Sequence, residues 1–184
     1  MCTMRNEEYI DRNKSDIKKV EKILASQSQR DLKLFVLGTN CGLRISDLLA
    51  LNVGDVRNKT HIQIVEKKTG KFKKFPINNR LKPIIEVFVK GRRNAEPLFL
   101  SHWRHRLDRV AAYYLIRDAC EKAGLQEKIG THSMRKTFGY HHYKQFKDAV
   151  ILQKIFSHST PQITLRYIGI EQDQIDYSYS DFII

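Results

Sequence analysis

Several basic, imidazole and phenol side chains in this 184-residue chain have the types and spacing needed to act on a phosphodiester. A guanidinium group suits the extra negative charge of a phosphorane, because its planar fork donates two parallel hydrogen bonds and stays charged. Arg44 lies at the start of a predicted helix, where backbone N–H groups also favour an anion. His132 and Arg135 stand three positions apart and share one helix face. A protein without metal ligands must also supply its own nucleophile, and Tyr167 follows His158 on the next predicted helix.

Each of these residues also has a structural explanation when it is taken alone. Arg44 suits a side chain that caps a neighbour's carbonyl groups, and His132 with Arg135 suits a surface pair. The lysine-rich segment 67–71 is typical of a solvated turn, and Tyr167 suits a half-buried core position. The joint occurrence of these residue types, rather than any one of them, favours a phosphodiester site.

Two histidine pairs raise the question of a metal site: His102 with His105, and His141 with His142. The second pair is adjacent on a predicted helix, so its rings point in different directions. No cysteine or carboxylate completes a tetrahedral set around either pair. We expect no metal and no cofactor, and a metal-dependent nuclease is disfavoured because its carboxylate cluster is missing.

The charge of the chain points to a polyanionic partner. Lys and Arg number 33 against 20 Asp and Glu, for a net charge of +13. Residues 171–184 hold four of the acids and no base, so residues 1–170 carry 33 bases against 16 acids, a net +17. Nucleic acid is the commonest partner of so basic a protein, and an anionic membrane surface is the second.

Targeting signals are missing from the sequence. No apolar run reaches the roughly 18 residues of a spanning helix, and the first residues contain no apolar segment of a secretory signal. Three cysteines, an odd number widely spread, fit the reducing cytoplasm. We therefore expect a cytoplasmic protein that does not cross a membrane.

The elements that must position these side chains are mostly helices. Helices are predicted over 15–26, 29–40, 44–51, 81–89, 106–123, 131–144 and 148–156, and from 160 onward. Alternating β-branched residues predict a strand over 60–65, with a return strand over 72–77 and a possible third strand at 98–101. The sequence thus predicts a single domain over 1–184, mainly α with a small antiparallel β-sheet inserted.

Three segments resemble the three boxes of the tyrosine recombinases, the phage integrase family. They are CGLRISDLLAL (41–51), HSMRKTFGYHHY (132–143) and FSHSTPQITLRYIG (156–169). His158 and Tyr167 are nine positions apart, as in the family, and the resemblance extends from about residue 20 to 170. Two departures are modest: Ser157 stands where the family usually has glycine, and Met134 where it usually has leucine.

The resemblance implies a role for each matching residue. Arg44 and Arg135 would clamp the scissile phosphate, and His132 would act beside the nucleophile as acid, base and hydrogen-bond donor. Tyr167 would attack and form a 3′-phosphotyrosyl link, so that religation needs neither ATP nor metal. Lys68 would protonate the leaving 5′-hydroxyl, and its choice over the neighbouring lysines depends on family spacing.

Three further positions match the family. His158 would donate to a phosphate oxygen. Asp47 and His141 would support the catalytic side chains rather than contact the phosphate. A second basic and aromatic loop is expected to contact the DNA backbone or to pack on it; it contains His102, Trp103, Arg104 and Arg106.

The implied function is that of a site-specific DNA recombinase or integrase, acting on double-stranded DNA as a homo-oligomer in a tetrameric synapse. Family members usually carry an N-terminal core-binding domain, which we expect to be absent here, so DNA binding should be weak and salt-sensitive. The acidic tail 171–184 is expected either to dock on a neighbouring subunit or to pack on its own domain. The alternatives are a type IB-like topoisomerase and a DNA-binding remnant without activity.

Overall fold

The computed structural model describes residues 13–125, 129, 132–180 and 182–183. Two strands, β1 (His61–Val65) and β2 (Phe72–Pro76), pair as an antiparallel hairpin. The helices are α1 (Lys14–Gln27), α2 (Gln29–Cys41), α3 (Ile45–Ala50), α4 (Leu81–Val89), α5 (Arg109–Lys122), α6 (Ser133–Phe146), α7 (Ala149–Phe156), α8 (Pro161–Tyr167) and α9 (Ile170–Ser180), with a 3-10 turn at Val53–Asp55. This confirms the predicted fold class.

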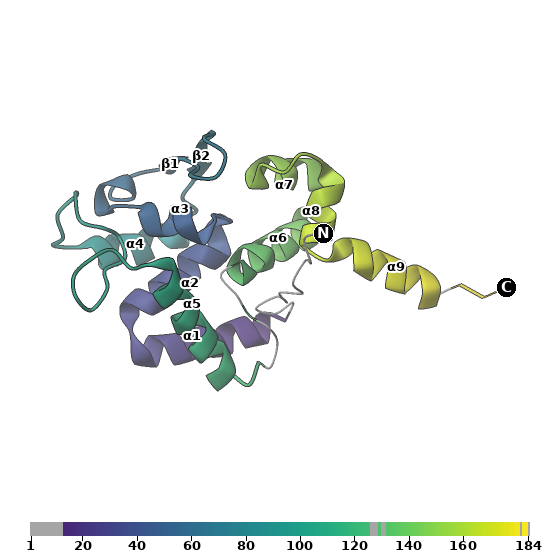
Figure 1. The fold of residues 1–184 in the computed structure, drawn as a ribbon, viewed down its shortest axis with the longest axis horizontal. Coiled ribbons are helices and arrows are strands. Elements are labelled where there is room, and N and C mark those ends of the chain that lie inside the picture. The colour runs from purple at the N-terminus through teal and green to yellow at the C-terminus, as the bar shows by residue number, and fades with distance from the viewer. Residues whose placement is uncertain (1–12, 126–128, 130–131, 181, 184) are drawn as a thin grey trace.

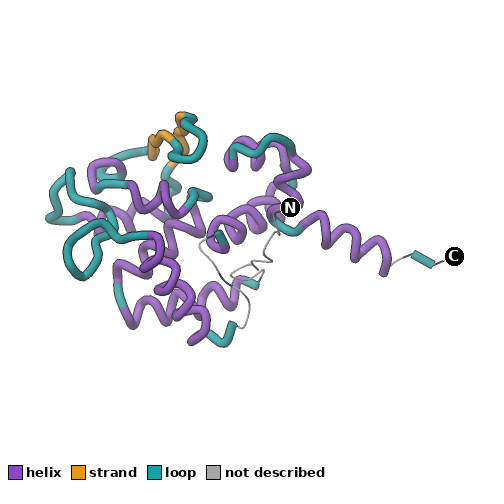
Figure 2. The backbone as a smooth tube through the Cα atoms, in the orientation of Figure 1, coloured by secondary structure: helices purple, strands orange, loops and turns teal. Residues whose placement is uncertain are grey.

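The helices divide into a larger group, α1 to α5, and a smaller one, α6 to α8 (Figure 1). The larger group surrounds the main hydrophobic core, and the smaller group has its own cluster at Tyr140, Leu152, Phe156, Ile168 and Ile170. Figure 2 shows the hairpin at the edge of the larger group, on the side that faces α7. The helix α9 extends away from both groups (Figure 1).

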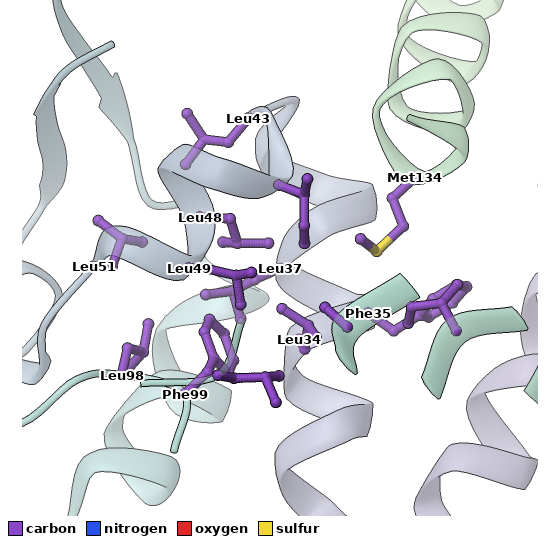
Figure 3. Packing of buried hydrophobic residues seen from close by; sticks show 14 of the residues in the cluster. Leu34, Phe35, Leu37, Leu43, Leu48, Leu49, Leu51, Leu98, Phe99 and Met134 are labelled. Carbon is purple, nitrogen blue, oxygen red and sulfur yellow. The ribbon is translucent and has the colours of Figure 1, made fainter. Parts of the chain in front are cut away.

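Helix α2 is central to the larger group because its apolar residues lie on more than one face. Leu34, Phe35 and Leu37 are all buried, as the continuous apolar run in the sequence predicts. Met134 of α6 points into the same region (Figure 3), and it packs so closely on Gly38 that a Cβ there would lie 2.5 Å from its sulfur. The flexible thioether thus joins α6 to the main core.

Two glycines allow close packing, one at the end of α2 and one within the smaller group of helices. Gly42 ends α2 with φ at 62°, a left-handed conformation that glycine adopts without strain. Gly139 of α6 lies against α7 and α8, and a Cβ there would come within 2.8 Å of Phe156 and Ile168. Both positions therefore exclude a side chain.

The predicted helix at 81–89 agrees with α4, and Asp148 caps α7 through its bond from the Ile151 N–H, as expected. The predicted strand at 98–101 is wrong, because Leu100 forms only an isolated bridge to Arg106. Helix α5 begins at Arg109 rather than 106, since Asp108 is its N-cap. Thr131, the predicted start of α6, lies outside the described residues.

None of the helices in the described part of the chain is long and apolar enough to cross a bilayer.

Candidate active site

The C-terminal end of α7 is the point on which the predicted residues converge. A helix leaves its last carbonyl groups without intrahelical partners, and they carry the negative end of the helix dipole. Helix α7 ends at Phe156, and Ser157 follows in a left-handed conformation with φ at 53°. The last carbonyl groups of α7 accept from three cationic side chains of distant segments.

Arg135, in the first turn of α6, is the most buried of these cations at 3% exposure. Its guanidinium donates to the Gly42 carbonyl at 2.5 Å and to the Phe156 carbonyl at 2.8 Å, and it stacks over the Phe156 ring at 4.2 Å. Burial lowers the pKa of Arg135 to about 10, and an ionised Tyr167 is the largest of the influences that oppose this. The side chain is therefore charged and rigidly held.

Arg44 reaches the same carbonyl from the N-cap position of α3. Its NH2 group lies 3.4 Å from the Phe156 oxygen, and its NH1 group donates to Glu66 Oε1 at 2.7 Å. The two arginines predicted to clamp a phosphate thus share one acceptor atom, although they are 91 positions apart in the chain.

His158 lies in the turn between α7 and α8, and two contacts fix this turn. The Gln153 amide donates to the His158 carbonyl at 3.1 Å, and the His158 Nδ1 lies 3.0 Å from the Thr164 hydroxyl. Burial first, and then the charges of Arg135, Arg44 and Lys73, together lower the pKa of His158 to about 4. The imidazole is therefore neutral at physiological pH.

Tyr167 is the last residue of α8, a helix that Thr160 caps and Pro161 opens. Its ring is half-buried and meets the rings of Phe156 and His158 edge to face, at centroid distances of 5.5 and 5.1 Å. The Nζ of Lys136 lies 5.7 Å from the centre of the ring. The chain thus places the Tyr167 phenol beside its own cation cluster.

The lysine that the hairpin contributes to the cation cluster is Lys73, whereas the family resemblance implied Lys68. Lys68 lies in the exposed turn between the strands. Lys73 of β2 instead enters the cluster: its Nζ lies 3.3 Å from Glu66 Oε1 and bonds to the main-chain carbonyls of Lys154 and Ile155. Burial lowers the pKa of Lys73, Glu66 raises it, and the two arginines lower it again.

The other predicted residues lie at the margins of the cluster. His132 is exposed at the N-terminal end of α6. Asp47 is buried, and its Oδ1 accepts from the Lys67 N–H at 3.1 Å, which joins α3 to the hairpin turn. His141 is half-buried with its ring edge-on to Tyr140 at 5.4 Å.

A cleft of about 540 Å³ opens beside the cluster, between the hairpin and α7. Its walls come from the end of α2, from β2 and from the α7–α8 turn, and they include Lys71, Lys73, Lys74, Lys154 and His158. A groove with so many cations and one neutral imidazole is suited to a phosphodiester backbone.

Sequence reasoning missed Glu66 and Lys73. Strand alternation could have found Lys73, because a period of two puts it on the same hairpin face as buried Ile62 and its partner Phe75. Arg106 was expected near DNA, but its guanidinium donates to the Leu49 and Leu51 carbonyls at 2.6 and 3.0 Å. The Arg106 side chain therefore holds its own loop against the C-terminal end of α3.

Comparisons with known proteins identify the family of the chain. The phage integrase family model matches residues 12–173. The "Probable integrase/recombinase YoeC" of Bacillus subtilis is 44% identical over 172 residues, which cover 93% of this chain and 94% of YoeC.

Two solved structures share the fold. The XerA recombinase superposes with a TM-score of 0.74 at 19% identity, over 98% of this chain and 66% of its own. The XerH site-specific recombinase, bound to a palindromic difH substrate after cleavage, gives 0.70 at 17% identity, over 96% and 54%. This chain therefore spans only about half to two thirds of those two chains. With the family model matched over most of its length, the chain belongs to the phage integrase family of tyrosine recombinases, enzymes that cleave and rejoin DNA.

Proposed function

We propose that the chain cuts and rejoins double-stranded DNA by transesterification through Tyr167, as a site-specific recombinase or integrase. The observation that carries the proposal is the convergence of Arg44, Arg135, His158 and Tyr167 of one chain at the end of α7. Two guanidinium groups, one imidazole and one phenol are the set that an in-line attack on a phosphodiester requires.

The proposed first step forms one bond and breaks one. The Tyr167 oxygen attacks phosphorus and the bond to the 5′-oxygen breaks, which leaves a 3′-phosphotyrosyl link and a free 5′-hydroxyl. The phenol proton passes to His132 or to solvent, and Lys68 supplies a proton to the leaving oxygen. Religation reverses these transfers, so the bond energy is conserved without ATP or metal.

The remaining groups stabilise charge. Arg44 and Arg135 neutralise the non-bridging oxygens of the phosphorane, where preorganised donors act most strongly. We assign the Thr164 hydroxyl proton to His158 Nδ1 at 3.0 Å rather than to the Thr160 carbonyl at 3.4 Å, which leaves the Nε2–H of the neutral ring as a donor to the phosphate. Lys68 must approach from the hairpin turn when DNA enters the cleft.

Double-stranded DNA is the proposed partner, in an assembly of several copies of the chain. The basic body and the cationic cleft support DNA binding. For the assembly we propose a tetrameric synapse, with α9 as the segment that reaches a neighbouring copy. We propose that the described residues form one catalytic unit that binds DNA weakly on its own. A nanomolar Kd at about 150 mM salt would contradict that weak binding.

A trapping experiment tests the function. Nicked duplexes, from which the freed 5′-end diffuses away, are incubated with the wild type, with Tyr167→Phe and with Tyr179→Phe as a matched control on α9. Because the cognate site is unidentified, a pool of candidate duplexes is used. A covalent band on a denaturing gel from the wild type and Tyr179→Phe, but not from Tyr167→Phe, is the expected result. A band that survives Tyr167→Phe would exclude this nucleophile.

A further inference from the structure

The carboxylate of Glu66 lies at the centre of the cation cluster, directly after β1. The residue is 1% exposed. Its Oε1 accepts from Arg44 NH1 at 2.7 Å and lies 3.3 Å from Lys73 Nζ, while its Oε2 accepts from the Thr69 hydroxyl at 2.6 Å. The Ser157 side chain also lies near enough to lower the pKa of this carboxyl group. Both oxygens of this buried carboxylate are therefore hydrogen-bonded.

The charges around Glu66 explain why a carboxylate is stable in this position. Burial alone raises the pKa of Glu66, but the hydrogen bond from Thr69, the charges of Lys73 and Arg44 and the nearby Ser157 side chain outweigh it and hold the pKa at about 2. Without this anion, the neighbouring cations would repel one another in a partly desolvated site. The ionised carboxylate thus makes a preassembled cation cluster possible before any phosphate arrives.

The contacts of Glu66 join three segments that are far apart in the chain. Arg44 comes from the start of α3, Thr69 and Lys73 from the hairpin, and Ser157 from the turn after α7. Ser157 adopts φ at 53°, a conformation that costs a non-glycine residue energy. This turn places the Ser157 side chain near the Glu66 carboxyl group, at a position where the sequence pattern of the family favours glycine.

We propose that Glu66 is a positioning residue, which orients the Arg44 guanidinium for the scissile phosphate and holds the hairpin beside it. A guanidinium has five N–H groups, and the contacts with Glu66 and Phe156 use one on each terminal nitrogen. The other N–H groups remain for a phosphate, in an orientation set in advance. The orientation of Arg44 is independent of the reaction, whereas its consequence for catalysis depends on the proposed function.

The first test measures the guanidinium directly, in the DNA-free protein. Rotation about the Cζ–Nε bond is slow in a guanidinium held on both terminal nitrogens, so separate NMR signals for NH1 and NH2 are expected for Arg44 in the wild type. The signals are assigned by their loss in Arg44→Lys. In Glu66→Gln we expect the two Arg44 signals to merge while those of Arg135, which is held by Gly42 and Phe156, stay separate.

The matched control is Glu121→Gln, which removes a carboxylate from an exposed ion pair with Arg117 on α5. We expect this variant to leave the Arg44 signals unchanged. Unchanged Arg44 signals in Glu66→Gln as well would overturn the proposal. If Glu66→Gln fails to fold, Glu66→Asp takes its place, because it keeps the charge but draws the carboxylate back by one methylene from Arg44 NH1. Unchanged Arg44 signals in folded Glu66→Asp would likewise overturn the proposal.

The second test separates positioning from a loss of folded protein. With a nicked duplex that traps the wild type, Glu66→Gln should form the adduct at least about tenfold more slowly, as expected for a misplaced reacting group. The final amount of adduct and the half-saturating DNA concentration should stay within about threefold. A lower amplitude at an unchanged rate constant would indicate unfolding alone and would contradict the positioning role.

The two proposals fail in different ways. If no duplex traps the wild type while the Arg44 signals merge in Glu66→Gln, the proposed function is wrong and the orientation of Arg44 by Glu66 stands. If the wild type is trapped and Glu66→Gln is trapped at the same rate, the proposed function stands and the role of Glu66 in catalysis is wrong.

Discussion

The rings of His158 and Tyr167 meet edge to face with their centroids 5.1 Å apart, at an interplanar angle of 76°. Nine positions separate them, and a tight turn followed by the short helix α8 closes that separation. Thr164, one turn before Tyr167 on the same helix, bonds to the imidazole. The helix thus orients the histidine and the phenol together, so a shift of α8 must disturb both.

Moving α8 away from α6 should therefore impair the site without removing any of its polar groups. In Gly139→Ala the new Cβ would lie 2.6 Å from Ile168 and 2.7 Å from Phe156, closer than real contacts allow. We expect a loss of about 1–3 kcal/mol in the free energy of unfolding, the usual cost of overpacking. Urea denaturation measures it, and adduct formation should slow in parallel. Ala111→Gly on α5 calibrates how much one methyl group on a helix changes the free energy of unfolding.

Arg135 should not tolerate replacement by lysine, although the charge is kept. A lysine ammonium cannot reproduce the fork that spans the Gly42 and Phe156 carbonyls. We expect adduct formation to slow about 100-fold or more and the free energy of unfolding to fall by about 1–3 kcal/mol. Arg166→Lys, on the exposed side of α8 beside Glu171, is the matched control. Equal rates for the two variants would contradict a phosphate contact by Arg135.

Because His158 is neutral in the folded chain, we expect the free energy of unfolding to fall in acid. Burial and then the nearby cations hold its pKa at about 4 in the folded chain, below the ordinary 6.5. The unfolded chain therefore binds this proton more readily, so the stabilisation is complete above about pH 6.5 and is lost as the pH falls toward about 4. Because the ring is only partly buried, we expect a loss of about 1–2 kcal/mol over this window rather than the full value.

Urea denaturation at several pH values checks the assignment. His158→Gln should flatten the pH dependence between about pH 6.5 and 4, whereas His105→Gln, in an exposed loop, should leave it unchanged. Glu66 acts in a lower window: its stabilisation is complete above its ordinary pKa of 4.5 and is lost toward about 2. A steep loss above pH 4.5 that survives His158→Gln would require a different titrating group.

Local patterns predicted the elements well where side-chain periodicity or capping was strong. The apolar run of α2, the alternation of β1 and the Thr160-Pro161 start of α8 all appear in the structure. The short apolar segment at 98–101 misled the prediction of a third strand, because a strand needs a partner that local sequence does not reveal. Periodicity therefore identified the elements better than it identified their pairing.

The site was predictable only as far as family spacing extended. Arg44, Arg135, His158 and Tyr167 come together at α7, but the spacing said nothing of Glu66, whose contact with Arg44 bridges 22 positions. A buried carboxylate at the end of a strand has no local signature, since its partner Arg44 comes from a distant segment and Lys73 from the opposite strand. Lys73 illustrates the same limit: its strand position was readable, but its contact with the α7 carbonyls, more than 80 positions away, was not.

The tail offers a last prediction, since the sequence left open whether it packs on its own domain or on another copy. Helix α9 packs against α8 and then extends away from the body (Figure 1). Apolar side chains on and after it remain exposed: Ile175 at 45%, Tyr179 at 81%, Phe182 at 70% and Ile183 at 92%. An apolar strip of this kind is typical of a surface that a partner covers.

Deletion of residues 171–184 should therefore weaken self-association while the domain stays folded. Ile170, which is buried at 4% exposure, is kept, so the cluster around Phe156 and Ile168 is preserved. We expect sedimentation on DNA to show smaller assemblies and the Tm to change by no more than about 2 °C. Tyr179→Ser with Phe182→Ser in the 184-residue chain should weaken self-association in the same way, because it removes apolar area without shortening the helix. A lower Tm with unchanged mass would instead show that the tail stabilises its own domain.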